Sequence, residues 1–322
     1  MLCGASGGVN STRRNAVGLP TYAVVTAARD EQANLPRLAE SLANQTQRPV
    51  EWLIVDNGST DGTAAAIATL CSSYGWISTI RTVGESVPVR GATIAKALEM
   101  GFSSIRTATE VVVVCDADVS FGPSHFSRLM TEFQHDRRLG IVSGTRLEFE
   151  RGRWRPRHVT GSSVQAQCRA YRIDCLNDVL PYERTAGWDG VDVAKANIKG
   201  WRTFVLPDLV FLHHRPLGRR DGSRWRAWSN EGKAAYSMGY RPTYVAIRAA
   251  FRAIDDPAAL GLLKGYVSAV LCRDARCRDP DVLSYLHQQQ SFRRLASRLA
   301  EARGRPSERD GPNWHGSTSP AD

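Results

Sequence analysis

The sequence predicts an α/β fold in which crossover helices connect the strands of a mostly parallel sheet, followed by a C-terminal helical extension. The first indication is the run of four valines and a cysteine at 111–115, whose lack of polar alternation predicts a strand buried on both faces. The second is the alternation of strand and helix patterns through residues 1–120, which is typical of parallel strands joined by crossover helices. The third is a change near residue 217 from strand-forming to arginine-rich helical sequence.

Composition divides the chain into a folded middle and two tails. Residues 1–19 are small, polar and glycine-rich, and residues 303–322 are rich in glycine, serine, proline and charge, so both are expected to be disordered. Between them we expect an α/β domain at 20–217 and a basic helical extension at 218–302. The first 20 residues lack the apolar core of a signal peptide, and no window reaches the ~18 apolar residues of a spanning helix. Seven scattered cysteines without CxxC spacing are typical of free thiols in a reducing compartment, so we expect a cytoplasmic protein.

The remaining elements follow from residue type and periodicity, taken in chain order. Short strand-forming runs predict strands at 22–26, 51–55, 77–81, 140–143, 201–206 and 209–214. Apolar residues at helical spacing predict a first helix with Leu35, Leu38 and Leu42 on one face, then helices at 64–70, 92–102, 124–133 and 163–176, and one that ends at Gly200. Between the second strand and its helix, 56–63 supplies turn and capping residues. Residues 146–157 are polar and basic and are expected to be irregular, and 183–192 is expected to be a loop.

Two carboxylates follow the central strand directly, as Asp116-Ala117-Asp118. In extended backbone, residues i and i+2 point to the same side, which would aim both side chains at one place. Hard oxygen ligands of this kind suit a magnesium or manganese ion that carries a diphosphate. On its own, Asp-x-Asp is more often a turn or capping pair, here before a helix near Pro123. The other acidic clusters favour the ligand interpretation.

Further polar clusters follow the first two strands, at Asp30-Glu31 and Asp56-Asn57, and a fourth acidic pair lies at Asp189 and Asp192. In open α/β sheets, ligands bind beyond the carboxyl ends of the strands, so these clusters mark one edge of the sheet as the site. No GxGxxG follows the first strand and no GK[ST] is present, which argues against a dinucleotide oxidoreductase and a P-loop nucleotidase.

Five segments carry a resemblance to a known family. They are residues 24–35, VDNGSTDGT at 55–63, DAD at 116–118, GWDGVD at 187–192 and LHHRP at 212–216. In this order and spacing, over about residues 20–217, they resemble the family-two glycosyltransferases, which have the GT-A fold with a Rossmann-like sheet. The later segments are most similar to bacterial members linked to surface polysaccharide assembly.

The resemblance implies an inverting, metal-dependent transfer of a sugar from a UDP- or GDP-sugar to a hydroxyl group of a carbohydrate or lipid-linked acceptor. It implies that Asp56 contacts the base of the nucleotide, Glu31 the base and ribose, Arg90 the diphosphate and Asp116 the ribose or the metal. It implies Mn²⁺ or Mg²⁺ as cofactor, with Asp118 as the main ligand and one of two histidines, His213 or His214, completing the site.

The general base implied by the resemblance is Asp189 or Asp192. Family members often carry Glu-Asp at this place, whereas Trp188-Asp189 stands here, so both aspartates remain candidates. Trp188 is either an acceptor-side stacking platform or a core residue. The usual asparagine after the first strand is also replaced, by Ala27-Ala28-Arg29, which bears on the nucleotide contacts.

The basic helical extension bears on which partners the chain binds. The net charge of +10 suits nucleic acid, an anionic membrane or phosphorylated substrates, and with the resemblance we expect no nucleic acid. An apolar patch at 260–270, flanked by arginines, is typical of helices that lie on an anionic membrane surface, here the inner face of the membrane. The alternative is a helix packed on the domain with its arginines in water. A second function class also remains, a non-catalytic basic binding protein on the same fold.

Overall fold

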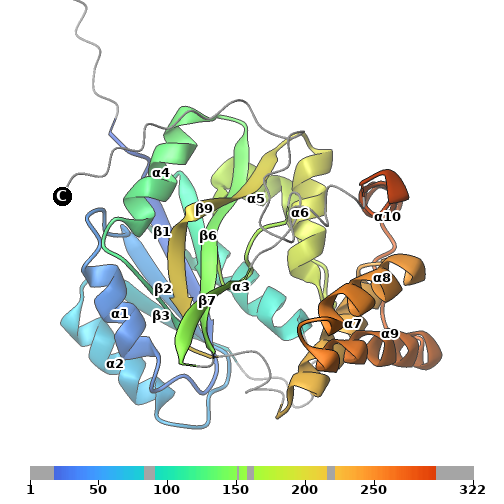
Figure 1. Ribbon diagram of the computed structural model, residues 1–322. Coiled ribbons are helices and arrows are strands. Elements are labelled where there is room, and N and C mark those ends of the chain that lie inside the picture. The colour runs from blue at the N-terminus through green and yellow to red at the C-terminus, as the bar shows by residue number, and fades with distance from the viewer. Residues whose placement is uncertain (1–17, 83–90, 151, 158–162, 216–221, 295–322) are drawn as a thin grey trace, which may run out of the picture.

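The computed structural model describes residues 18–82, 91–150, 152–157, 163–215 and 222–294 (Figure 1). Within these residues the strands are β1 (Tyr22–Ala28), β2 (Glu51–Asp56), β3 (Ile77–Arg81), β4 (Val111–Cys115), β5 (Val119–Phe121), β6 (Leu139–Glu150), β7 (Arg153–Arg157), β8 (Cys168–Arg172) and β9 (Arg202–His213). They form one sheet in the order β3-β2-β1-β4-β8-β6-β9-β5, and β7 pairs with residues 146–150 of β6. Most of the two expected tails, at 1–17 and 303–322, lies outside the described residues.

Helices cover both faces of the first half of this sheet. They are α1 (Leu35–Ala43), α2 (Thr63–Ser73), α3 (Ala92–Ser104), α4 (His125–His135), α5 (Ile173–Val179) and α6 (Trp188–Ile198). Because side chains alternate along a strand, Val24 and Val113 pack on α1, α2 and α4, while Val25 and Val112 pack on α3, α5 and α6. β1 to β4 are parallel, so the expected α/β sheet with crossover helices is confirmed.

The second half of the sheet is mixed, and two expectations there are wrong. Residues 146–157 are not irregular, because β6 runs on to Glu150 and forms a hairpin with β7, in which Arg146 pairs with Arg157. In this part of β6 the polar side chain faces inward and the apolar one outward: Glu148 is buried and Phe149 is exposed. The usual pattern of apolar residues on the inner face of a strand is therefore absent from the sequence here. The expected strands at 201–206 and 209–214 are one strand, β9, with an irregularity in its pairing to β6.

The helix expected at 163–176 is also wrong. Cys168–Arg172 is instead strand β8, which lies antiparallel between β4 and β6, and only the short α5 follows it. Pairing to two strands far away in sequence overrides the local helical preference here. The expected loop at 183–192 ends early, because α6 begins at Trp188 after Gly187, whose φ of 83° suits glycine at this turn.

Between residues 222 and 294, the described part of the C-terminal extension, there are four helices and a short 3₁₀ turn, namely α7 (Arg224–Ser237), α8 (Pro242–Ala253), η1 (Pro257–Leu260), α9 (Gly261–Cys272) and α10 (Pro280–Gln289). A Cβ at Gly265 would lie 1.8 Å from the carbonyl oxygen of Ser229, and a Cβ at Gly232 would lie 2.1 Å from that of Leu262. The backbones of α7 and α9 are therefore in direct contact.

The extension is joined to the sheet by charge and by apolar packing. Arg224 at the start of α7 pairs with Glu150 of β6 at 3.1 Å and with Asp256 at 2.7 Å. Val282 and Leu286 of α10 join a small apolar core with α6. None of the described helices has the length and apolarity needed to cross a bilayer.

Candidate active site

Three acidic side chains meet where β1, β2 and β4 end. Because these strands are parallel and Ala28 pairs with Asp56, their carboxyl ends lie at one edge of the sheet. Glu31, Asp56 and Asp118 are all buried there. Asp56 accepts a hydrogen bond from the Ser59 backbone N–H at 3.0 Å and lies 3.4 Å from the Arg81 guanidinium, which fixes the carboxylate. The expected acidic edge is therefore present.

Asp116 and Asp118 belong to a turn between β4 and β5, not to extended backbone as expected. Asp116 lines a pocket beside the ends of β1 and β4, while the Asp118 carboxylate faces β9. The two carboxylates therefore have different neighbours in this structure. Arg90, the fourth expected donor-binding residue, lies outside the described residues.

Arg215, just after β9, joins two of the acidic loops. Its Nη2 donates to Glu31 Oε2 at 2.5 Å, and its Nε lies 3.2 Å from Asp118 Oδ2. The Asn34 amide also donates to Glu31, at 2.7 Å. Sequence reasoning gave Arg215 no role because its partner Glu31 stands 184 positions earlier in the chain.

His213 lies between two carboxylates. Its Nε2 is 3.5 Å from Asp118 Oδ1, and its Nδ1 is 3.2 Å from Glu148 Oε1. Burial alone would lower the pKa of His213, but the hydrogen bonds to Asp118 and Glu148 raise it to about 9. Burial would likewise raise the pKa of Glu148, yet the bond with His213 and the nearby arginines lower it to about 2.

This arrangement fits a divalent cation. Asp118 offers a hard oxygen, and His213 Nε2 would offer a nitrogen on the same side once a bound cation displaced its proton. Glu148 contacts the other ring nitrogen, as carboxylates do for metal-bound histidines. The described residues contain no group of three such ligands, so a cation here would take its other ligands from phosphate oxygens and water. Glu148 was missed by sequence reasoning because 146–157 was expected to be irregular.

His214 is oriented differently. Its Nε2 is 2.8 Å from the Ser120 hydroxyl, and its ring stands edge-on to Trp154 with the centroids 5.6 Å apart. Of the two histidine side chains, that of His213 faces the Asp118 carboxylate, and that of His214 faces Ser120 and Trp154.

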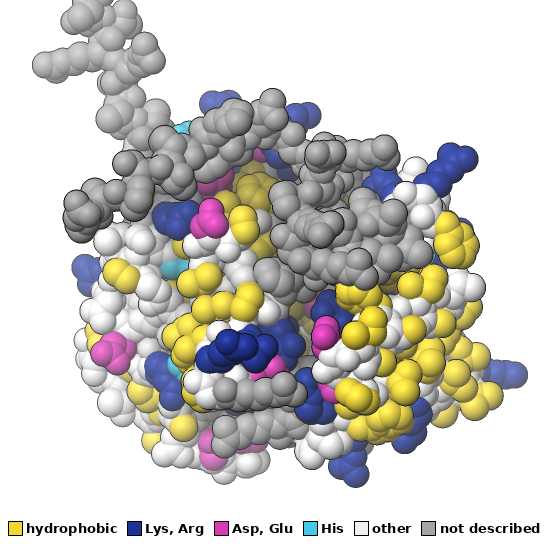
Figure 2. Space-filling view, in the orientation of Figure 1, with side chains coloured by type: hydrophobic (Ala, Val, Ile, Leu, Met, Phe, Trp, Pro, Cys, Tyr) yellow, Lys and Arg dark blue, Asp and Glu magenta, His cyan; other side chains and the backbone are white. Residues whose placement is uncertain are grey.

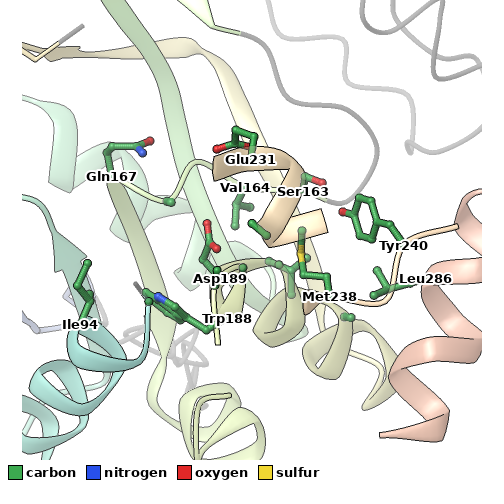
Figure 3. A pocket seen from close by; sticks show the side chains of 18 of the residues that line it. Ile94, Ser163, Val164, Gln167, Trp188, Asp189, Glu231, Met238, Tyr240 and Leu286 are labelled. Atoms are coloured by element: carbon green, nitrogen blue, oxygen red, sulfur yellow. The ribbon is translucent and has the colours of Figure 1, made fainter. Parts of the chain in front are cut away.

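A pocket of about 390 Å³ continues from this edge toward the extension (Figure 3). Its inner end is formed by β1, β4 and Asp116, and its middle by Trp188 and Asp189 of α6. Its outer end is formed by the extension, through Glu231, Met238, Tyr240, Tyr244, Arg248, Tyr285 and Leu286. Figure 3 shows the carboxylates of Asp189 and Glu231 in the same cavity, on helices from different parts of the chain.

The two candidate base residues have different surroundings. The Asp189 side chain keeps 36% of its surface exposed and lines the pocket, whereas the Asp192 side chain is 1% exposed. Asp192 accepts hydrogen bonds from Arg169 Nη1 at 2.9 Å and from the Tyr171 hydroxyl. Asp192 is thus committed to an internal network, and only Asp189 faces the cavity.

Arg169 connects the two aspartates. Its Nη1 also donates to the Asp189 carbonyl oxygen at 2.8 Å, and its Nη2 lies 3.8 Å from the Asp189 carboxylate. The low-dielectric surroundings raise the pKa of Asp189 against the opposing charge of Arg169, and Glu231 raises it further. Burial raises the pKa of Asp192 to about 6, again opposed by Arg169. Arg169 gave no sequence signal because it stands in the segment expected to be helical.

Trp188 belongs both to the core and to the wall of the pocket. It is largely buried and packs on Tyr182 with the ring centroids 4.5 Å apart, yet it also forms part of the pocket wall. An aromatic wall beside Asp189 offers a stacking surface for a sugar ring.

Comparison with known proteins agrees with the sequence resemblance. The sequence profile of "Glycosyl transferase family 2" matches residues 23–184. An N-acetylglucosaminyl-diphospho-decaprenol L-rhamnosyltransferase of Mycobacterium tuberculosis is 33% identical over 37% of this chain and 39% of its own length. A beta-monoglucosyldiacylglycerol synthase of Nostoc sp. is 25% identical over 38% of this chain and 25% of its own. The chain thus matches well under half the length of these curated relatives.

The fold itself is shared with solved structures. A mannosyltransferase from Pyrobaculum calidifontis, in complex with GDP-Man and Mn²⁺, superposes with a TM-score of 0.55 at 16% identity and covers 89% of this chain and 85% of its own. The expected GT-A architecture is confirmed by this likeness.

Proposed function

Because the chain belongs to glycosyltransferase family 2, we propose that it transfers a sugar from a nucleoside-diphosphate sugar to a hydroxyl group of an acceptor. One observation carries this proposal: the pocket that contains Asp189 reaches Ala27, Cys115 and Asp116, at the sheet edge where Glu31, Asp56 and Asp118 are buried. A donor at the edge and an acceptor in the pocket would then meet beside a base.

The donor half of the proposal rests on the fixed carboxylates. Asp56 is a buried acceptor that suits the N–H groups of a uracil or guanine base, and Glu31 and Asp116 suit the ribose hydroxyls. The donor is accordingly a UDP- or GDP-sugar. Arg90 keeps its proposed role at the diphosphate on the sequence resemblance alone.

The cofactor is Mn²⁺ or Mg²⁺. Asp118 and His213 would hold it with help from Asp116, and a bound cation offsets the negative charge that develops on the leaving diphosphate. Glu148 keeps the imidazole in place from the other side. Arg215 adds a fixed positive charge between Glu31 and Asp118, at the place where the phosphates of the donor belong.

The transfer inverts the anomeric centre. Asp189 removes the proton of the acceptor hydroxyl from the face opposite the leaving diphosphate, so a single displacement is expected. The raised pKa of Asp189 lies closer to the operating pH than that of an ordinary carboxylate, which makes Asp189 a better general base. Asp192 acts through Arg169, which holds the backbone of Asp189 in position.

We further propose a lipid-linked acceptor and a peripheral place at the cytoplasmic face of the membrane. The names of both curated relatives include lipids. The outer face of α9 is apolar: Val267 is 54% and Leu271 is 78% exposed, and Leu260, Leu263 and Val270 lie on the same face beside Lys264. Figure 2 shows hydrophobic side chains gathered over this part of the extension. Buried free thiols such as Cys115 and Cys168 fit a reducing compartment.

The direct test measures release of nucleoside diphosphate by the full chain from a panel of UDP- and GDP-sugars, with Mn²⁺ and with EDTA. We expect release from at least one donor with metal and little without it. Asp118→Ala should abolish metal-dependent binding of the nucleoside diphosphate in calorimetry. Failure of every donor to bind or react in the presence of metal would reject the proposed function.

A further inference from the structure

The outer half of the pocket belongs to the extension and lies beyond the proposed base. Glu231 of α7, Tyr240 after α7, and Tyr244 and Arg248 of α8 form its walls. With the donor proposed at the inner end, these side chains line the remaining part of the cavity, and Figure 3 shows Glu231 and Tyr240 around the same cavity as Asp189. The extension therefore shapes the space on the acceptor side of Asp189.

Arg248 brings a positive charge to this wall, and Arg252 and Arg157 lie close enough to it to act electrostatically on one another. Arg248 is 28% exposed, and its Nη2 is 3.4 Å from the Glu231 carboxylate. Arg252 follows one turn later on α8, and burial together with the charges of Arg248 and Arg157 lowers its pKa, against a smaller opposing effect of Asp255. Arg157 of β7 is itself held by Glu148 and Glu150.

These cations are incompletely balanced. Arg157 forms ion pairs with two carboxylates, and Arg248 forms one with Glu231. No carboxylate of the described residues lies at ion-pair distance from Arg252. Like charges four residues apart on a helix destabilise it, and partial burial increases the cost. An anion bound beside Arg248 and Arg252 would offset this repulsion.

We propose that Arg248 and Arg252 bind a phosphate group of the acceptor, while Tyr240 and Tyr244 pack against the sugar that carries the reacting hydroxyl. Guanidinium groups match phosphate geometry with paired hydrogen bonds, and tyrosine rings suit the apolar faces of sugars. The two rings stand edge to face with centroids 5.7 Å apart, and both line the pocket. This inference rests on the proposed function and specifies its acceptor as a sugar phosphate.

The test uses inorganic phosphate as the probe, titrated into the full chain at constant ionic strength with Mg²⁺ and saturating nucleoside diphosphate present. Thermal melting should show phosphate-dependent stabilisation of the wild type. The double variant Arg248→Gln, Arg252→Gln should weaken the apparent phosphate affinity by about tenfold or more, since both charge-assisted contacts are lost. Arg278→Gln, an exposed arginine between α9 and α10, is the matched charge control and should behave as the wild type.

Two further measurements keep the outcomes separate. Nucleoside diphosphate binding should be unchanged in the double variant, and a loss there would assign the cations to the donor and overturn the acceptor role. Arg252→Gln alone should be at least as stable as the wild type, because it removes a like charge, so a folding defect will not obscure the result. Equal phosphate stabilisation in wild type and double variant, or none in the wild type, would also overturn the proposal. Phosphate binding without any donor binding would reject the proposed function and leave the anion site standing.

Discussion

Replacing Asp189 by asparagine removes the proposed base while leaving its surroundings almost unchanged. Arg169 holds this residue mainly through the Asp189 backbone carbonyl, at 2.8 Å, and the closest guanidinium contact to the carboxylate is longer, at 3.8 Å. The amide has the shape of the acid and faces a cavity, so α6 should keep its position. The carboxylates proposed to bind the donor, Glu31 and Asp56, belong to other loops and should be unaffected.

The expected magnitude follows from these contacts. Loss of general-base catalysis costs ~10²–10⁴-fold in kcat, while donor affinity should change by less than about twofold, because the base acts only in the transition state. Single-turnover transfer gives the first number and calorimetry with nucleoside diphosphate and Mn²⁺ gives the second. A variant that keeps full activity would refute the assignment of Asp189.

Asp192→Asn is the matched comparison. Its carboxylate is the close partner of Arg169, and both side chains are 1% exposed, so the change leaves the buried guanidinium with only the Asp189 carboxylate, 3.8 Å away, as a counter-charge. Breaking such a pair costs about 3–5 kcal/mol, which corresponds to roughly 10 °C in Tm. We therefore expect Asp189→Asn to lose rate and keep stability, and Asp192→Asn to lose stability. The opposite pattern would make Asp192 the base.

Three other predictions follow from the site and the extension. The rate of transfer should fall as pH drops through the raised pKa of Asp189, at a higher pH than for an ordinary carboxylate, and this acidic limb should vanish in Asp189→Asn; a limb that persists unchanged belongs to another group. Glu148→Gln should weaken Mn²⁺ binding about 10–100-fold in calorimetry, since it orients His213, and unchanged affinity would remove that role. Val267→Ser with Leu271→Ser should reduce co-sedimentation with anionic vesicles at low salt, and equal sedimentation of variant and wild type would place the membrane contact elsewhere.

What the sequence could predict depended on how local the signal was. The strand at 111–115 was found because burial on both faces leaves a continuous apolar run, and the acidic edge was found because turn residues follow parallel strands directly. By contrast, β8 is a strand because β4 and β6 lie on either side of it, and nothing in Cys168–Arg172 records those neighbours.

The missed site residues share one property. Glu148 and Arg169 are charged side chains that are buried because their partners come from elsewhere in the fold, His213 being 65 positions away and Asp192 being 23. From the sequence alone, a charged residue is expected to be exposed to solvent, and only the assembled sheet shows that Glu148 and Arg169 face inward. The choice between Asp189 and Asp192 was open for the same reason. Both belong to α6, and only the packing around that helix shows that Asp189 faces the cavity and Asp192 the core.

The glycine contact between α7 and α9 has a mechanical consequence. With Gly265 against Ser229 and Gly232 against Leu262, the two helices cannot slide or separate without losing backbone contact, so they move as one piece. α9 carries the apolar face proposed for the bilayer, and α7 carries Glu231 in the wall of the pocket. The distance between the pocket and a membrane would then be fixed by the rigid pair of α7 and α9, because no flexible linker separates the apolar face of α9 from Glu231. An acceptor anchored in the bilayer would have to present its sugar at that one height to reach Asp189.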